Sequence, residues 1–280
     1  MERVLSREVK SRVGEKITIE GWLHKKRLLG GLTFINVRDR AGLTQVVLRD
    51  KDEVEKLRGL QIGTVLRVEG NVAEEPRAPG GAELHDAALE VLVPVTDEPP
   101  IEIDKPLSHR PDNLDTLLDN RVIGLRNLQE QTIFKVQAKV LEAAREYFIQ
   151  NGFTEMNTPK LLAEATEGGA EVFKLDYFGK EATLAQSAQF YKQMMVGVFE
   201  RVFETNPTYR AEPSATTRHM TEYITIDAEM GFIEFDDLLT FSSGFLNHIV
   251  NSVWETYADD LKKWNTQKPL LTSEFPRLGM

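Results

Sequence analysis

The sequence contains no cysteine, which excludes disulfide bonds and thiolate metal sites. Such a composition fits a reducing compartment. No apolar run approaches the roughly 18 residues of a membrane-spanning helix. The opening segment MERVLSREVK also lacks the apolar stretch of a secretion signal. We therefore predict a cytoplasmic protein with no membrane partner.

Positive charge is also in short supply. The chain has 34 Lys and Arg against 44 Asp and Glu, a formal net charge of -10. Nucleic acids are bound through cations that neutralise phosphates, so this balance by itself argues against a nucleic-acid partner. An acidic protein can still present one basic face, and Lys25-Lys26-Arg27 is a candidate for it. Runs of this kind are more often solvated turns.

What remains is an ordinary globular composition, 41% hydrophobic and 28% charged over 280 residues. At about 150 residues per domain, this length predicts two domains. Residues 1–103 show short alternating or β-branched runs separated by turn signals such as Gly30-Gly31. Five predicted strands with a short helix at 52–60 indicate an OB-fold β-barrel, a fold that often binds oligonucleotides. A small barrel without a binding role is the alternative. The expected strands are 16–24, 32–37, 43–48, 64–72 and 84–95.

The rest of the chain predicts a second domain of mixed type. Prolines at 99, 100 and 106 mark residues 104–127 as a linker or hinge. Residues 128–150 have the 3.6-residue apolar period of a helix, which Asn151-Gly152 ends. Strands and helices then alternate, with helices expected near 189–199 and 236–257 and a strong strand at 223–232. The predicted fold class is therefore α+β, with a barrel at 1–103 and a second domain at 128–280.

Two patterns in this second domain point to chemistry. Arg210-Ala211-Glu212 is followed by Thr217-Arg218-His219. An arginine can pair bidentately with a phosphate and offset charge that develops there, but a buried Arg-x-Glu is more often a structural ion pair. Lys192 lies on a predicted helix and would suit an anionic ligand, although most helix lysines are simply exposed.

Eight segments, taken in order and spacing, resemble the class II (subclass b) aminoacyl-tRNA synthetases, and among them the archaeal-type aspartyl-tRNA synthetases. The match extends over nearly the whole chain, which turns individually weak motifs into a strong signal. It implies an OB-fold anticodon-binding domain followed by the first part of the class II antiparallel-sheet catalytic domain, with motifs 1 and 2 but without motif 3. The segments are GWLHKKR (21–27), FINVRD (34–39), GFTEMNTPK (152–160), TEGG (166–169), QSAQFYKQ (186–193), YRAE (209–212), TRH (217–219) and IDAEM (226–230).

The resemblance implies ATP-dependent attachment of L-aspartate to tRNA(Asp) through aspartyl-adenylate, by a homodimer that uses ATP and Mg²⁺. Arg210 and Glu212 would be the catalytic residues. The same two would bind ATP together with Arg218 and His219. Glu167, Gln189, Lys192 and Asp227 would bind aspartate, whereas Glu229 could serve structure alone.

In the barrel, the resemblance places an anticodon site at His24, Arg27, Phe34, Gln45 and Pro79. Phe34 could stack on a base, although a strand phenylalanine usually belongs to the core. Arg27 and Gln45 would bind base edges, as proteins do with unpaired RNA. His24 and Pro79 resemble the non-discriminating variety, which charges both tRNA(Asp) and tRNA(Asn).

Several departures keep alternatives open. Ser187-Ala188-Gln189 and the loop 78–83 are closer to asparaginyl relatives, so asparagine–tRNA ligase is one alternative. A non-catalytic tRNA-binding paralogue is the other. The family's metal-binding carboxylate, the arginine for the substrate carboxylate and the motif 3 arginine have no match, so no metal ligand is assigned. We expect no aspartyl-adenylate formation by this chain alone in an ATP–pyrophosphate exchange assay.

Overall fold

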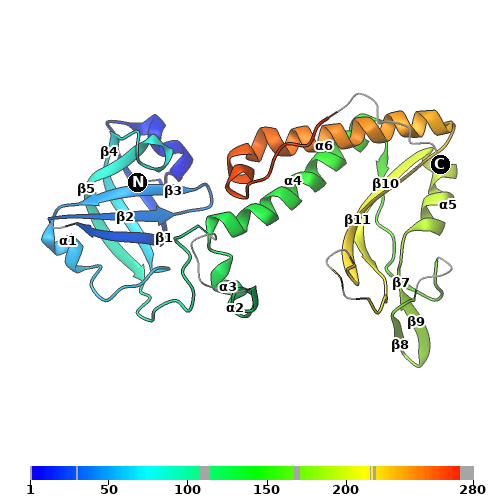
Figure 1. The fold of residues 1–280 in the computed structure, drawn as a ribbon, viewed down its shortest axis with the longest axis horizontal. Coiled ribbons are helices and arrows are strands. Elements are labelled where there is room, and N and C mark those ends of the chain that lie inside the picture. The colour runs from blue at the N-terminus through cyan, green and yellow to red at the C-terminus, as the bar shows by residue number, and fades with distance from the viewer. Residues whose placement is uncertain are drawn as a thin grey trace. The chain divides into compact units, whose positions relative to one another are not determined.

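The computed structural model describes residues 2–29, 31–106, 114–166, 171–214, 216 and 219–271. Contacts divide the chain into two compact units, Met1–Gln131 and Thr132–Met280 (Figure 1). Among the described residues, none of the helices combines the length with the apolar character of a membrane span.

The first unit is a closed five-stranded barrel with the strand order β1-β2-β3-β5-β4, which confirms the predicted OB-fold. All neighbouring strands are antiparallel except β3 and β5, which run parallel. Short helices lie before β1, between β3 and β4, and before β5. The elements are η1 (Ser6–Arg12), β1 (Lys16–Leu29), β2 (Leu32–Arg38), β3 (Leu43–Leu48), α1 (Lys51–Glu55), β4 (Val65–Glu74), η2 (Pro79–Gly81) and β5 (Ala82–Val93).

The period-two alternation of the strands builds the barrel interior. Alternate residues point to opposite faces of a strand, so one set fills the barrel and the other faces outward. Along β2, Ile35 and Val37 are buried in the core, whereas Phe34 and Asn36 are half-buried on the other face. Phe34 is therefore not a core residue, contrary to the usual fate of a strand phenylalanine.

Strand β1 is longer than the sequence predicts and does not end at His24. Its first part, from Lys16 to Trp22, pairs with β4, and its second part, from Trp22 to Leu29, pairs with β2. Gly21 lies where β1 changes partners, and a Cβ atom there would collide with the backbone carbonyl of Arg38. The missing side chain thus allows the close approach that closes the barrel. The basic run 25–27 consequently lies on a strand instead of in a turn.

Replacing Gly21 with alanine should destabilise the barrel by about 2–4 kcal/mol, because the collision is with backbone and cannot be relieved by a side-chain rotation. Urea unfolding followed by Trp22 fluorescence, with the two tryptophans of the second unit replaced by phenylalanine, measures this. Gly31→Ala is the control, since a Cβ there meets nothing within 4 Å. Equal stability of the two variants would contradict this account of the corner.

The predicted linker is partly helical, with α2 (Leu114–Asp119) and α3 (Arg121–Gly124). Ile101 and Ile103, just before it, are buried, and the linker is anchored to this stretch at its far end. The Asn127 side-chain amide donates to the backbone oxygens of Ile103 and Lys105 at 3.0 and 2.8 Å. The polar sequence pattern predicted a hinge but did not show these anchors.

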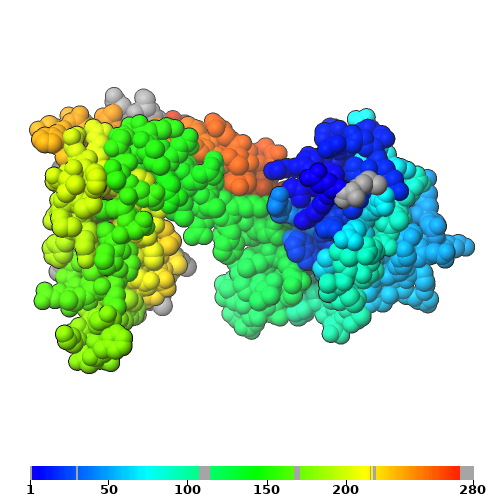
Figure 2. All heavy atoms as spheres, turned by 180° about the vertical axis from the view of Figure 1, so that it is seen from behind, coloured from blue at the N-terminus to red at the C-terminus, as the bar shows by residue number. Residues whose placement is uncertain are grey.

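The described part of the second unit contains two small sheets and three helices, which fits the predicted α+β class. One sheet has the order β11-β10-β6, with β10 and β11 antiparallel; the other has the order β7-β9-β8. The β8–β9 hairpin projects beyond the rest of this unit (Figure 1, Figure 2). The elements are α4 (Leu128–Gln150), β6 (Thr154–Glu155), β7 (Leu161–Leu162), β8 (Lys174–Tyr177), β9 (Lys180–Leu184), α5 (Gln189–Phe199), β10 (Arg201–Tyr209), β11 (Glu222–Met230) and α6 (Phe235–Lys263).

The β10–β11 ladder separates an apolar face from a polar one. On the apolar face Phe203 stacks on Phe148 of α4 at 4.7 Å between ring centroids, and residues of β11 and α6 complete the cluster. Val202, one residue earlier, points to the opposite face and packs beneath α5. Burial of the aromatic side chains contributes about 1.5–3 kcal/mol each and fixes the ladder against α4 and α6.

Candidate functional site

The outer face of the barrel holds a hollow of about 190 Å³ over β1, β2 and β3. The strand register explains it: Arg27 lies opposite Phe34, and Asn36 lies opposite both Lys25 and Gln45. Four of the five predicted anticodon residues, Arg27, Phe34, Gln45 and Pro79, therefore meet in one place. Lys25, which belongs to the candidate basic run, also lines the hollow. Sequence inspection did not select the remaining lining residues, Asn36 and Arg77, although each lies two positions from a selected residue, Phe34 and Pro79.

A buried carboxylate orients one side of this hollow. Glu83 accepts a hydrogen bond from Nε2 of Gln45 at 2.6 Å, and its other oxygen lies 2.7 Å from Nε2 of His85. With one amide N–H held by Glu83, Gln45 still has an amide oxygen and a second N–H with which to bind another group. Lys26, the middle residue of the basic run, does not line the hollow; its Nζ donates a hydrogen bond to the backbone oxygen of Leu60 at 2.6 Å.

His24, the fifth predicted anticodon residue, does not line the hollow. It is 5% exposed, and its Nδ1 has no hydrogen-bond partner among the described residues. Burial, together with the positive charges of Arg38 and Lys25, lowers the pKa of His24 to about 4, against the opposing effect of Asp104. The imidazole is therefore neutral near pH 7.

The low pKa of His24 makes barrel stability depend on pH. Between pH 6.5 and about 4 the unfolded chain binds a proton at this residue and the folded chain does not. Stability should therefore fall as the pH drops through this window, by up to about 3 kcal/mol from this group alone. His24→Gln should remove this part of the pH dependence, so the variant should lose less stability than the wild type as the pH falls from 6.5 to 4. The urea midpoints of both proteins, followed by Trp22 fluorescence at each pH, measure the difference.

The control is His219→Gln, which removes an exposed histidine of the second unit. Its pH profile for barrel unfolding should follow that of the wild type. A profile for His24→Gln that stays parallel to the wild type between pH 6.5 and 4 would contradict the assignment.

In the second unit, the polar face of the β10–β11 ladder gathers the side chains predicted to bind ATP and amino acid. Glu204 and Asp227 are paired residues on this face, and the ladder continues beyond β10 through a hydrogen bond from Arg210 N to Thr221 O at 3.0 Å. Asp227 lies five positions along β11 from Glu222, which is opposite Tyr209; this is about 17 Å of extended strand. The two groups of predicted residues thus lie at opposite ends of one hairpin.

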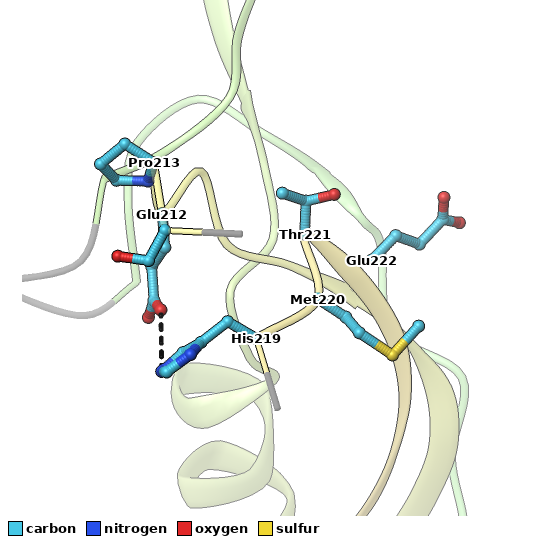
Figure 3. A pocket seen from close by; sticks show the side chains of 7 residues that line it. Glu212, Pro213, His219, Met220, Thr221 and Glu222 are labelled. Atoms are coloured by element: carbon cyan, nitrogen blue, oxygen red, sulfur yellow. Dashed lines mark ion pairs between the residues drawn. The ribbon is translucent and has the colours of Figure 1, made fainter. Parts of the chain in front are cut away.

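At the Arg210 end, Glu212 and His219 line two adjoining hollows of about 320 and 500 Å³. Glu212 Oε2 lies 3.9 Å from His219 Nε2, and the two side chains point toward one another (Figure 3). The Nε of half-buried Arg210 has no hydrogen-bond partner among the described residues. A guanidinium donor without a partner beside a hollow is suited to an oxyanion. Tyr223 and Met220 also line this end and were not selected from the sequence.

At the α5 end, Lys192 is 5% exposed and forms the centre of an ion-pair cluster. Its Nζ lies 2.6 Å from Asp227 Oδ1 and 3.5 Å from Glu229 Oε2. Gln189, at the start of α5, lies one helical turn before Lys192 on the same side of the helix. The structure therefore brings together three of the four predicted aspartate-binding residues and adds Glu229 to them.

Two predicted residues, Glu167 and Arg218, lie outside the described residues. Within the part of the chain that the structure describes, no three His, Asp or Glu side chains are grouped to hold a metal ion.

The hollow of the barrel and the polar face of the sheet belong to two different domains. Comparison with family models identifies both. Residues 17–94 match the OB-fold nucleic acid binding domain, and residues 113–280 match the tRNA synthetases class II (D, K and N). The chain belongs to this class II tRNA synthetase family.

Curated relatives support this membership. The chain is 40% identical over 280 residues to the aspartate–tRNA(Asp/Asn) ligase of Thermus thermophilus, covering 99% of the chain and 64% of the relative. It is 40% identical over 273 residues to the ligase of the same name from Methanopyrus kandleri, covering 95% and 63%. The aspartate–tRNA(Asp) ligase of Pyrococcus abyssi is 40% identical over 271 residues, covering 95% and 61%. The chain thus spans less than two thirds of their length.

Solved structures show the same fold. An asparaginyl-tRNA synthetase from Pyrococcus horikoshii, complexed with asparaginyl-adenylate, superposes with a TM-score of 0.85 at 31% identity, covering 96% of this chain and 64% of that one. An asparaginyl-tRNA synthetase from Entamoeba histolytica with the same type of ligand gives 0.81 at 25% identity, covering 96% and 62%. Aspartate and asparagine enzymes therefore both occur among the similar proteins.

Proposed function

We propose that this chain provides the tRNA-, ATP- and aspartate-binding parts of a cytoplasmic aspartate–tRNA ligase. The observation that carries the proposal is the buried Lys192, held by Asp227 and Glu229 on the same sheet face as Arg210. Free aspartate has one ammonium group and two carboxylates. Lys192 is complementary to one of these carboxylates, and Asp227 with Glu229 is complementary to the ammonium group.

The proposed roles follow from that complementarity. Lys192 binds the side-chain carboxylate of aspartate, while Asp227 and Glu229 are placed to hold its ammonium group. Gln189 donates or accepts hydrogen bonds that orient the substrate. Glu167, in the loop resembling the one that closes over the amino acid, would add a further carboxylate. Desolvation of Lys192 strengthens these interactions relative to water.

Arg210 is proposed to contact the α-phosphate of ATP. The α-carboxylate oxygen of aspartate attacks the α-phosphorus, an O–P bond forms, and pyrophosphate leaves. The guanidinium offsets charge on the phosphoryl oxygens as the bond order changes. Glu212 would accept from the adenine amino group or from the acceptor end of tRNA. Arg218 and His219 would contact the remaining phosphates. Holding both substrates on one hairpin supplies orientation.

The second step transfers the aspartyl group to tRNA. A hydroxyl of the terminal ribose attacks the acyl carbon of the adenylate, and AMP leaves. Mg²⁺, which class II synthetases use with ATP, would offset phosphate charge when bound. Homodimerisation is proposed from the resemblance of residues 152–160 to motif 1.

Replacing Lys192 with methionine should weaken L-aspartate binding at least tenfold, because the counter-charge for the substrate side chain is removed. Isothermal titration calorimetry of the 280-residue chain with aspartate and with asparagine measures this. The control, Lys174→Met, removes an exposed lysine paired with Glu181 in the same unit and should bind aspartate like the wild type. Undiminished aspartate binding by Lys192→Met would refute the assignment.

An asparagine–tRNA ligase is the second candidate. It is favoured by the Ser187-Ala188-Gln189 segment and by the similarity to the asparaginyl enzyme of Pyrococcus horikoshii. The same titrations separate the two: tighter binding of asparagine than of aspartate by the wild-type chain would establish the second candidate. A chain that binds neither amino acid but binds tRNA would instead indicate a non-catalytic tRNA-binding protein.

The barrel hollow is proposed to bind the anticodon, with Phe34 stacking on a base and Arg27, Gln45 and Pro79 around it. The neutral, buried His24 would act on selectivity only indirectly, through the backbone of β1. We expect transcripts of tRNA(Asp) and tRNA(Asn) to bind with affinities within about threefold of each other, since relaxed selectivity treats the third anticodon base alike.

Phe34→Leu should weaken the binding of both transcripts about 5- to 100-fold, the range expected for one lost stacking interaction. Fluorescence anisotropy with labelled transcripts measures this at fixed salt. Phe178→Leu, which changes an almost fully exposed phenylalanine of the second unit, is the control. A preference of more than tenfold for tRNA(Asp) would contradict relaxed selectivity, and unchanged binding by Phe34→Leu would contradict the stacking role.

A further inference from the structure

Glu204 is a carboxylate that is completely buried on the polar face of β10 and has no role in the proposed binding of substrates. It accepts hydrogen bonds from the backbone N and Oγ1 of Thr158 at 3.2 and 2.8 Å, and from Asn206 Nδ2 at 3.2 Å. Its other oxygen lies 2.6 Å from Nζ of Lys160. An ionised carboxylate without solvent requires such partners, because its desolvation costs several kcal/mol.

The same residues join the segments that contain the two halves of the site. Lys160 accepts, through its backbone oxygen, a hydrogen bond from Ala185 N at 2.9 Å. Ala185 O in turn accepts from Tyr209 N at 3.0 Å. The segment that leads into Gln189 and Lys192 is thus held between Lys160 and the residue before Arg210.

The negative charge of Glu204 lies beside the ion pair that Asp227 forms with Lys192. Glu204 and Asp227 are paired across β10 and β11, which brings their Cβ atoms to about 4.5–5.5 Å. Two like charges in this position destabilise the ladder unless each is neutralised. Lys160 neutralises Glu204 from the β6 side, and Lys192 neutralises Asp227 from beneath α5. The polar face therefore presents the alternating row Lys160, Glu204, Asp227, Lys192.

We propose that Lys160, acting through Glu204, is a positioning residue for Lys192. With Glu204 satisfied by Lys160, the Lys192 ammonium stays on Asp227 and Glu229 and is available to an anionic ligand. Without Lys160, the buried Glu204 carboxylate attracts Lys192 across the row and leaves an uncompensated negative charge. The part of this inference that concerns a ligand rests on the proposed aspartate site; the part that concerns Lys192 does not.

The test compares Lys160→Met with the double variant Lys160→Met/Glu204→Gln. The double variant removes both charges, and the glutamine oxygen can still accept from Thr158. The ¹H–¹⁵N resonance of the Lys192 ammonium, assigned by its loss in Lys192→Met, reports its surroundings without any ligand. We expect this resonance to shift in Lys160→Met and to return toward the wild-type position in the double variant. Lys174→Met is the matched control and should leave it unchanged.

Calorimetric titration of the same proteins then measures selectivity. Lys160→Met should weaken the binding of L-aspartate about tenfold. This is the effect expected of one uncompensated charge, here that of Glu204, about 10 Å from the ligand at an effective dielectric constant near 20. The binding of asparagine, whose side chain is neutral, should change less than twofold. The double variant should recover aspartate binding. Equal losses for both amino acids, or no recovery, would show a merely structural role and overturn the inference.

The two proposals fail in different ways. If the wild-type chain binds neither amino acid, the proposed function fails, and the Lys192 resonance still decides the role of Lys160. If the wild type binds aspartate but the resonance is the same in Lys160→Met, the positioning role fails and the proposed function stands. Should Lys160→Met not fold, the resonance in Glu204→Gln decides: an unchanged Lys192 signal there overturns the inference.

Discussion

The second unit depends on the antiparallel pairing of β10 with β11. In that ladder every residue on one strand has a fixed partner on the other. Because successive side chains of each strand point to opposite faces, the sheet has one apolar and one polar face. Phe203, Ile226 and Ala228 pack against α4 and α6 on one side. On the other side, the same register opposes Glu204 and Asp227 and leads to Arg210. The apolar face stabilises the sheet, and the rigidity obtained there lets the polar face hold charges that would otherwise be too costly to bury.

Buried charge is the common theme of that polar face. Lys192 and Glu204 are both almost inaccessible, and each is satisfied by opposite charge and hydrogen bonds instead of water. A buried ion pair adds little net stability by itself, because desolvation offsets much of the attraction. Its effect is to fix the geometry and the sign of the charge that a ligand meets, and selectivity between a charged and a neutral ligand depends on both.

The barrel also groups charged side chains on one face. Although the chain as a whole carries net negative charge, Lys25, Arg27 and Arg77 lie around Phe34 on one outer face of the barrel. Strand alternation sends Ile35 and Val37 inward and leaves Phe34 and Asn36 for the hollow. A cationic, partly aromatic surface of this kind can bind unpaired bases despite an overall negative charge, because binding depends on local charge. Glu83 adds direction by holding one N–H of Gln45.

The main strands and helices, the OB-fold and the family could be predicted from the sequence, because apolar period, turn residues and ordered motifs are local properties; the helices α2 and α3 of the linker could not. The sequence also selected Arg27, Phe34, Gln45 and Pro79, and Lys192 with Asp227, which the structure brings into two clusters. It did not show that β1 continues beyond His24 to Leu29, that His24 is buried, or that Glu204 and Lys160 lie next to the Lys192 cluster. Those facts depend on partners distant in the chain. Glycine is required at position 21 because the backbone carbonyl of Arg38 occupies the space that a Cβ atom would need. Glu204 lies opposite Asp227 only because of the register of β10 with β11.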